Sequence, residues 1–153
     1  VESAANVVMC RTFSKIFGLA GMRVGYGLGR PDIIDRVGNH IMAWPNGIGL
    51  TAAFHSYEDQ PFIAFSRQKV LQGRAMVEKT LRDAGFDPVQ SEANFVFVDI
   101  GRDAQAFREA MAQEGVLING GYAGYPTYIR VSMGKLEDLE VFDRVFKRVI
   151  ARA

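Results

Sequence analysis

One short stretch of the chain holds two hydroxyl groups and two cations, interrupted by glycines: Thr12, Ser14, Lys15 and Arg23. Hydroxyl donors and the fork of an arginine side chain are the groups that bind a phosphate monoester. A lysine amine held beside cationic groups and away from water loses its proton more easily, and it can then condense with a carbonyl of the bound molecule. A phosphate anchor beside an imine-forming lysine meets the requirements of pyridoxal 5′-phosphate (PLP). The Ser-Lys pair alone is weak evidence for such a site, because Ser14 could equally be a turn residue and Lys15 an ordinary solvated lysine on the surface.

Two predicted strands position these side chains. The apolar run 6–10 predicts a strand that ends at the hydroxyls and the amine, and residues 23–29 predict a second strand that begins with the arginine. A proline at the first helical position predicts a helix over 31–38. The breakers between residues 43 and 49 predict a loop.

The second half of the chain has a different pattern. Apolar residues recur at helical spacing over 61–84, which predicts one long amphipathic helix. The elements predicted after it are strand 94–99, a helix capped by Asp103 and running to Glu114, strand 116–118, strand 128–132 and helix 136–152. The order predicts an α/β chain in two parts, the end of a sheet-centred domain and a smaller α+β domain.

Composition excludes several classes of function. The chain has 153 residues and a net charge of +1, which gives no electrostatic attraction for nucleic acid or a membrane surface. Its single Cys10 lies in an apolar run, which favours an inert core thiol, and His40 and His55 have no ligand cluster around them, so no metal site is expected. We expect a cytoplasmic protein, since no apolar run reaches the length of a membrane span and no signal peptide is present.

Three segments resemble one family. Residues 11–26, RTFSKIFGLAGMRVGY, resemble the lysine segment of fold-type I PLP-dependent aminotransferases (class I/II), in particular the histidinol-phosphate aminotransferase branch. Residues 92–96, EANFV, are similar to the "ANF" strand of that branch, and residues 128–134, YIRVSMG, to its closing arginine strand. The resemblance extends over the whole chain, with these segments in the family's order.

The resemblance implies a role for each site residue. Lys15 forms the Schiff base with PLP and moves the proton between the substrate Cα and C4′ of the cofactor. The phosphate is held by Thr12, Ser14 and Arg23. Arg130 binds the substrate carboxylate in a bidentate fork, and Asn94 lies near the substrate. From spacing alone, Arg130 is instead a partner for Asp99 or Glu92 on a neighbouring strand.

The resemblance also implies the domain organisation. Residues 1–56 form the C-terminal part of a large PLP-binding domain that carries the lysine segment, and residues 57–153 form the small C-terminal domain with its connecting helix. The chain begins at Val1 without an initiator methionine, and we expect it to be the C-terminal part of a longer subunit. In the family, upstream residues supply the aspartate at the pyridinium nitrogen, so we expect this stretch alone to be inactive.

The implied function is PLP-dependent transamination between an amino acid, or histidinol phosphate, and a 2-oxo acid in a cytoplasmic homodimer. Asn119 stands where the branch often has an arginine, which leaves an aromatic or other amino acid as an alternative to a phosphate-bearing substrate. Two other functions stay open. One is a PLP-dependent decarboxylase of an amino acid or amino-acid phosphate on the same fold, and the other is a non-catalytic partner-binding domain.

Overall fold

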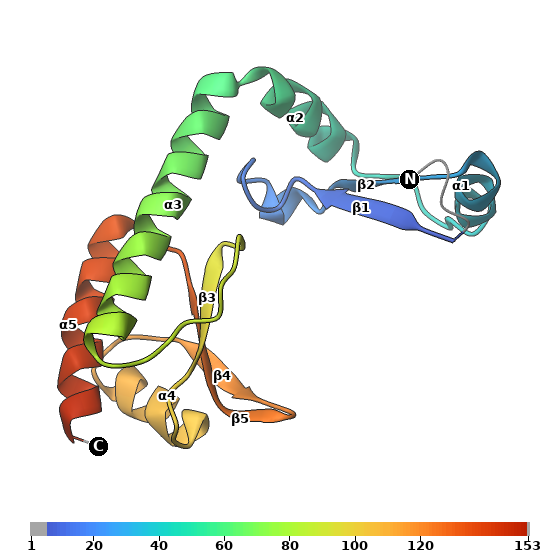
Figure 1. Cartoon of the computed structure of the whole chain (residues 1–153). Helices are drawn as coiled ribbons and strands as arrows, with labels where there is room; N and C mark the ends of the chain where they lie inside the picture. Colours follow the sequence, from blue (N-terminus) through green and yellow to red (C-terminus); the bar gives the residue numbers. More distant parts are fainter. Residues whose placement is uncertain (1–5, 153) are drawn as a thin grey trace. The chain divides into compact units, whose positions relative to one another are not determined.

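The structure, a computed structural model, describes residues 6–152 (Figure 1). Val1, at the opening of the chain discussed above, lies outside the described residues. The chain divides into two compact units, Val1–Ser66 and Arg67–Ala153. The division falls inside helix α3 (Gln60–Asp83), later than the expected boundary after residue 56. The assignment of the first part to a large PLP-binding domain stays a prediction.

The first unit is built on a two-stranded antiparallel ribbon. Strand β1 (Val8–Thr12) pairs with β2 (Gly25–Gly29) along its whole length, and the short 3-10 helix η1 (Ala20–Met22) lies in the loop between them. Helix α1 (Pro31–Gly38) follows β2 and has the predicted bounds. The two predicted strands are confirmed, and each begins two residues later than predicted.

The loop predicted over 43–49 is wrong at its end. Helix α2 (Gly47–Glu58) begins at the glycines that were taken as breakers. Gly49 is buried because the helix approaches the chain beside β2 so closely that a Cβ there would lie 2.6 Å from a methyl carbon of Val24. The glycine therefore serves close packing rather than chain reversal.

The apolar core of the first unit is small. It consists of Phe13, Val24 and Ala53, with Phe17 packed against it. Cys10 is exposed, so the prediction of an inert core thiol is wrong. In the described residues β1 pairs only with β2, and a two-stranded ribbon leaves both of its faces open.

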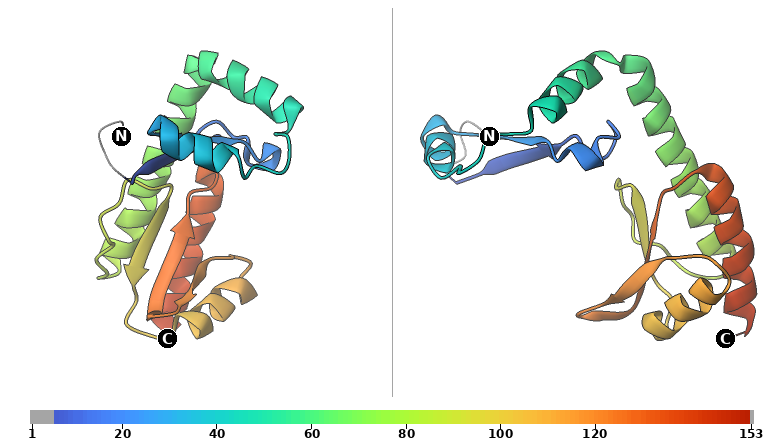
Figure 2. Two further views of the ribbon diagram at one scale, coloured as in Figure 1. Left: turned by 90° about the vertical axis from the view of Figure 1, so that its right-hand side faces the viewer. Right: turned by 180° about the vertical axis from the view of Figure 1, so that it is seen from behind.

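The second unit is a three-stranded antiparallel sheet covered by helices on one face. Its strands, in sheet order, are β3 (Phe95–Asp99), β5 (Tyr125–Ser132) and β4 (Asn119–Tyr122). The covering helices are α3, α4 (Ala104–Gln113) and α5 (Leu136–Arg152). Helices α3 and α5 run side by side (Figures 1 and 2).

Alternation along the strands builds the core of this unit. Val96, Val98, Ile129 and Val131 are buried towards the helices, while the intervening residues point to the opposite face. The last predicted helix is confirmed, and the apolar residues that recur at helical spacing along it are buried: Leu139, Phe142, Phe146 and Val149.

The strand predicted at 116–118 is wrong. Those residues form no strand, and β4 begins at Asn119. A Cβ at Gly120 would lie 2.7 Å from the carbonyl oxygen of Tyr128, so the glycine that suggested a break is what lets β4 lie against β5. The predicted cap of α4 is confirmed, because the carboxylate of Asp103 accepts a hydrogen bond from the amide of Ala106 at 2.7 Å.

Candidate functional site

Four residues, called here the donor cluster, lie at the end of β1 (Thr12) and in the loop between β1 and β2 (Ser14, Lys15 and Arg23). The amide of Ser14 donates to the Thr12 hydroxyl at 3.1 Å, which turns the chain sharply at the end of β1. A guanidinium nitrogen of Arg23 lies 3.5 Å from the Ser14 hydroxyl. The first unit therefore brings both hydroxyls and the arginine together, as the sequence predicts.

The backbone of Arg23 is unusual. Its φ of 54° and ψ of 49° place it in the left-handed region, and it is the single non-glycine residue with positive φ among residues 6–152. The guanidinium also donates to the carbonyl of Ala20 at 2.8 Å, which fixes the direction of the side chain. A non-glycine residue keeps such a conformation only where its surroundings hold it, and these positions concentrate at functional sites.

No carboxylate neutralises the donor cluster. Within the described part of the chain, neither Lys15 nor Arg23 forms an ion pair, and Lys15 is exposed. Two uncompensated cations beside two hydroxyls make a site for an anion with several acceptor oxygens. The residues present therefore fit the phosphate of PLP.

An aromatic cluster supports the end of β1. The buried ring of Phe13 lies 4.8 Å from that of Phe17 and 5.1 Å from that of Tyr57 on α2. The Tyr57 hydroxyl donates to that of Tyr26 at 2.7 Å, and this hydrogen bond raises the pKa of Tyr57. The rings of Phe13, Phe17 and Tyr57 pack on one another and so fix the strand end from which Lys15 projects.

Arg130 lies on β5 in the second unit, opposite Phe97 on one side and Asn119 on the other. Its guanidinium carbon lies 4.5 Å from the centre of the Phe95 ring, and its buried Nε has no hydrogen-bond partner among the described residues. Stacking on an aromatic ring leaves the edge of a guanidinium available for a bidentate anion.

The neighbouring acids do not pair with Arg130. Glu92 forms an ion pair with Arg74 at 3.0 Å. Asp99 accepts a hydrogen bond from the amide of Gly101 at 2.9 Å, and this bond together with one from Thr127 lowers the pKa of Asp99. The partners that spacing alone suggested for Arg130 are thus engaged elsewhere.

A cleft of about 350 Å³ adjoins Arg130, between the segment that leads into β4 and helix α5. Asn119, Ser132 and Asp138 contribute its polar lining, and Arg130 is the cation among its described lining residues. The cleft therefore offers a ligand one cation, the neutral polar side chains of Asn119 and Ser132, and the carboxylate of Asp138.

Asn94 has a backbone role in the structure. Its carbonyl accepts a hydrogen bond from the amide of Met133 at 3.0 Å, which joins the start of β3 to the end of β5. Its predicted place near the substrate stays a prediction. Phe95 was not singled out from sequence, although period-two alternation along 94–99 already places it on the open face of the sheet.

The described residues form neither a metal-binding cluster nor a membrane-crossing helix. Residues 6–152 contain no group of three His, Cys, Asp or Glu side chains able to hold a metal ion. None of the helices in this range has both the length and the apolar character that a membrane crossing requires.

Comparison with solved structures identifies the class to which this fold belongs. The histidinol-phosphate aminotransferase of Sinorhizobium meliloti, solved in complex with pyridoxal-5′-phosphate, matches 99% of this chain with a TM-score of 0.86 and 29% identity, over 43% of its own length. The histidinol-phosphate aminotransferase of Clostridium acetobutylicum, at 21% identity, shares the fold with a TM-score of 0.87 over 95% of this chain and 46% of its own. The chain thus has the mixed α/β fold of the fold-type I aminotransferases.

Sequence comparison names the family. Residues 1–145 match the aminotransferase class I and II family, and the chain belongs to it. The histidinol-phosphate aminotransferase of Moorella thermoacetica is 37% identical over 151 residues, covering 96% of this chain and 39% of the relative. Histidinol-phosphate aminotransferase 2 of Methylococcus capsulatus is 37% identical over 148 residues, covering 95% and 40%. The chain thus spans about two fifths of the length of these relatives.

Proposed function

We propose that this chain is part of a PLP-dependent aminotransferase of the histidinol-phosphate type, which exchanges an amino group between an amino acid, or histidinol phosphate, and a 2-oxo acid. Family membership, the names of the relatives and the PLP complex of the Sinorhizobium meliloti enzyme support the proposal. The observation that carries it is the donor cluster, with an exposed, unpaired Lys15 beside Arg23 and two hydroxyls. Because the chain spans about two fifths of its relatives, the activity is proposed for the full-length protein.

Each residue of the donor cluster has a separate task in this proposal. When bound, PLP supplies an aldehyde that condenses with amines and a ring that withdraws electrons from the substrate Cα. Thr12, Ser14 and Arg23 bind its phosphate, and the bond from Arg23 to the Ala20 carbonyl keeps the guanidinium aimed at the cluster. The Nζ of Lys15 would hold PLP through its aldehyde carbon, with water as the leaving group, and would later move the proton at the substrate Cα.

Arg130 binds the substrate carboxylate. The Phe95 ring holds the plane of its guanidinium, so that two parallel N–H groups meet the two carboxylate oxygens. When the carboxylate is held in one position, the orientation of the Cα–H bond relative to the reacting groups is set as well. A substrate without a phosphate, such as an aromatic amino acid, is supported by Asn119 and by the single arginine of the adjoining cleft.

We also propose a cytoplasmic homodimer. The first unit exposes large apolar side chains after α1, with Met42 99% and Trp44 97% exposed. Apolar exposure of this extent marks a surface that other polypeptide covers. A lone cysteine, which cannot form an intrachain disulfide, agrees with a reducing compartment.

The test of the proposed function uses the full-length protein. With PLP present, borohydride reduction and peptide mass spectrometry are expected to find a phosphopyridoxyl group on Lys15, and Lys15→Ala is expected to lack both the adduct and amino transfer. Assays with histidinol phosphate and with phenylalanine identify the substrate. Release of carbon dioxide without 2-oxo acid would favour the decarboxylase, and a biologically active Lys15→Ala protein would favour the non-catalytic domain.

A further inference from the structure

We propose that Asn46 and Gly49, at the start of α2, are positioning residues that hold Arg23 in its left-handed conformation and thereby set the phosphate subsite. This inference rests on the proposed function, because it concerns the same PLP phosphate. It adds two residues that are distant in sequence from the donor cluster and that do not belong to it.

Arg23 needs such support. A left-handed backbone is unfavourable for a non-glycine residue, because its Cβ comes too close to the following carbonyl oxygen. Arg23 has φ 54° and carries such a Cβ. The residues on either side of it, Met22 and Val24, must therefore be held by contacts from elsewhere in the first unit.

Asn46 contacts Met22, the residue that precedes Arg23. It occupies the N-cap position of α2, where an asparagine side chain normally accepts a hydrogen bond from the first turn of its own helix, yet it makes no such bond. Its side-chain amide instead donates to the carbonyl of Met22 at 3.3 Å. A capping group of α2 is thus used to fix the peptide that precedes Arg23.

Gly49 lies against both residues that flank Arg23, namely Met22 and Val24. A Cβ at this position would lie 2.6 Å from Cγ2 of Val24 and 3.1 Å from the carbonyl oxygen of Met22. The backbone of α2 thus packs directly on the residues that flank Arg23. Val24 is buried, and its carbonyl accepts a hydrogen bond from the amide of Phe13 at 3.1 Å, so it cannot move aside without loosening the end of β1.

Any displacement of this segment reaches the guanidinium. The side chain of Arg23 is aimed by its bond to the Ala20 carbonyl at 2.8 Å and approaches the Ser14 hydroxyl at 3.5 Å. Rotation of the backbone out of the left-handed region would turn the side chain away from Ser14. A phosphate would then lose a charge-assisted hydrogen bond, while a ligand without phosphate would lose nothing.

The experiment compares two glycines of the same helix in the full-length protein. Gly49→Ala introduces the clash, whereas Gly47→Ala is the matched control, since a Cβ there meets nothing within 4 Å. Dissociation constants are measured for PLP and for pyridoxal, which has the same ring and aldehyde without the phosphate. We expect the preference for PLP over pyridoxal to fall about tenfold in Gly49→Ala, as for the loss of one charged hydrogen bond. In Gly47→Ala the preference is expected to be unchanged.

Asn46→Ala provides a second measurement, because it adds no atoms and removes only the bond to Met22. We expect a smaller fall in the same preference, and if Gly49→Ala does not fold, Asn46→Ala alone decides. An equal loss of PLP and pyridoxal affinity, or an unchanged preference in the folded variants, overturns the inference and leaves the proposed function standing. A wild-type protein that binds no PLP overturns the proposed function, and the inference with it.

Discussion

At the scale of single residues, the two arginines with proposed binding roles are held in different ways. Arg23 is aimed by hydrogen bonds from its guanidinium to a carbonyl and towards a hydroxyl. Arg130 is held by the face of Phe95, with its Nε buried and unpartnered among the described residues. The first arrangement suits a compact phosphate, and the second suits a planar carboxylate.

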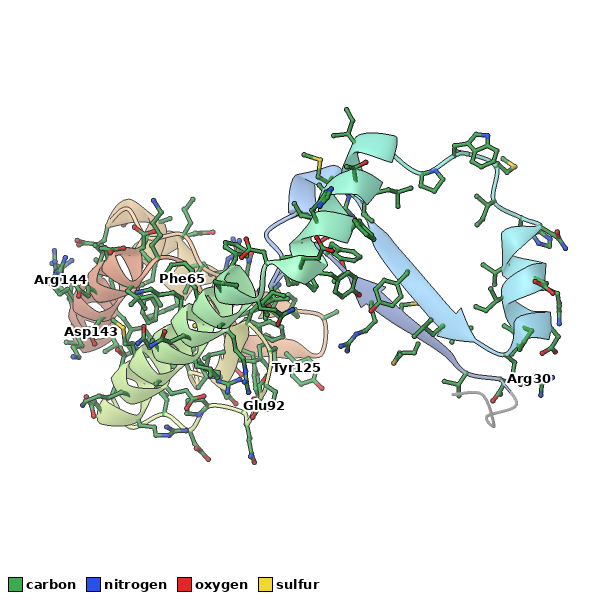
Figure 3. All side chains as sticks on the ribbon, turned by 90° about the horizontal axis from the view of Figure 1, so that it is seen from above. Arg30, Phe65, Glu92, Tyr125, Asp143 and Arg144 are labelled. Carbon is green, nitrogen blue, oxygen red and sulfur yellow. The ribbon has the colours of Figure 1, made fainter. Side chains whose placement is uncertain are left out.

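The proposed role of Arg130 predicts the effect of Arg130→Lys. An ammonium keeps the charge but cannot form two parallel hydrogen bonds or stack in the same way on Phe95, so we expect KM for the amino acid to rise about tenfold or more. Steady-state kinetics of the full-length protein measure this, with Arg144→Lys on the exposed surface of α5 as the control (Figure 3). An unchanged KM would contradict a carboxylate role for Arg130.

Sequence and structure agree best where one residue sets the conformation of its own segment. Thr12, Ser14 and Lys15 fall within four consecutive positions, so the local turn brings them together whatever surrounds it. The left-handed Arg23 was not foreseeable, because its conformation depends on contacts with α2, more than twenty residues further along the chain.

At the scale of elements, predictions that rest on local signals are correct, and those that depend on contacts distant in sequence are wrong. Helices α1 and α5 were predicted with their bounds, because a proline start and a regular apolar face are local signals. Helix α2 and the position of β4 were missed, since Gly49 and Gly120 look like breakers in sequence. Only tertiary packing shows that each provides room for a neighbouring chain segment.

Close packing of α3 on α5 predicts the effect of Gly73→Ala. A Cβ at Gly73 would lie 2.7 Å from Cδ1 of the buried Leu139. Overpacking typically costs about 1–3 kcal/mol, of which better helix propensity returns up to about 1 kcal/mol, so we expect a net loss of about 1–2 kcal/mol in the free energy of unfolding.

Urea unfolding of the full-length protein measures this loss. The double variant Gly73→Ala/Leu139→Ala is expected to lose less than the sum of the two single variants, because the shortened side chain makes room for the new methyl group. Strict additivity would show that the two side chains do not meet.

A carboxylate at the contact between the same helices predicts a dependence on pH. Asp143 on α5 (Figure 3) accepts a hydrogen bond from the Thr80 hydroxyl of α3 at 2.6 Å and lies 2.8 Å from the ammonium of Lys147. Burial raises the pKa of Asp143, but the bonds from Lys147 and Thr80 outweigh it, and the pKa is lowered overall. A lowered pKa in the folded state means that the carboxylate contributes stability above its unfolded pKa of about 3.9.

That contribution is lost as the pH falls from the unfolded value through the lower, folded one. We therefore expect Asp143→Asn to reduce the free energy of unfolding at neutral pH by about 1 kcal/mol and to reduce it less in strong acid. Chemical denaturation of wild type and variant at several pH values measures the difference. A difference that is the same at all pH values would show that Asp143 does not act through its charge.

At the scale of the whole molecule, the two units differ in how much of their apolar surface they cover themselves. The second unit has one continuous core drawn from the strands β3 and β5 and the helices α3, α4 and α5. The first unit has a three-residue buried core and exposes Ile48 and Phe54 of α2 at 76% and 65%. Such surface is stable in water when other polypeptide packs on it, which agrees with a longer subunit and a homodimer.

Trp44 makes this proposal measurable, because it is the single tryptophan in the 153 residues and is 97% exposed in the structure. In the full-length protein, with any other tryptophan replaced by phenylalanine, we expect covering polypeptide to shift its fluorescence emission to shorter wavelength and to protect it from acrylamide. In the 153-residue chain alone, the indole stays in water and is quenched freely.

Dilution of the full-length protein below its dimer dissociation constant distinguishes the two polypeptides that could cover Trp44. Protection that disappears on dilution comes from the second copy, and protection that persists comes from the rest of the subunit. Free quenching at every concentration would mean that this segment of the first unit is covered by neither.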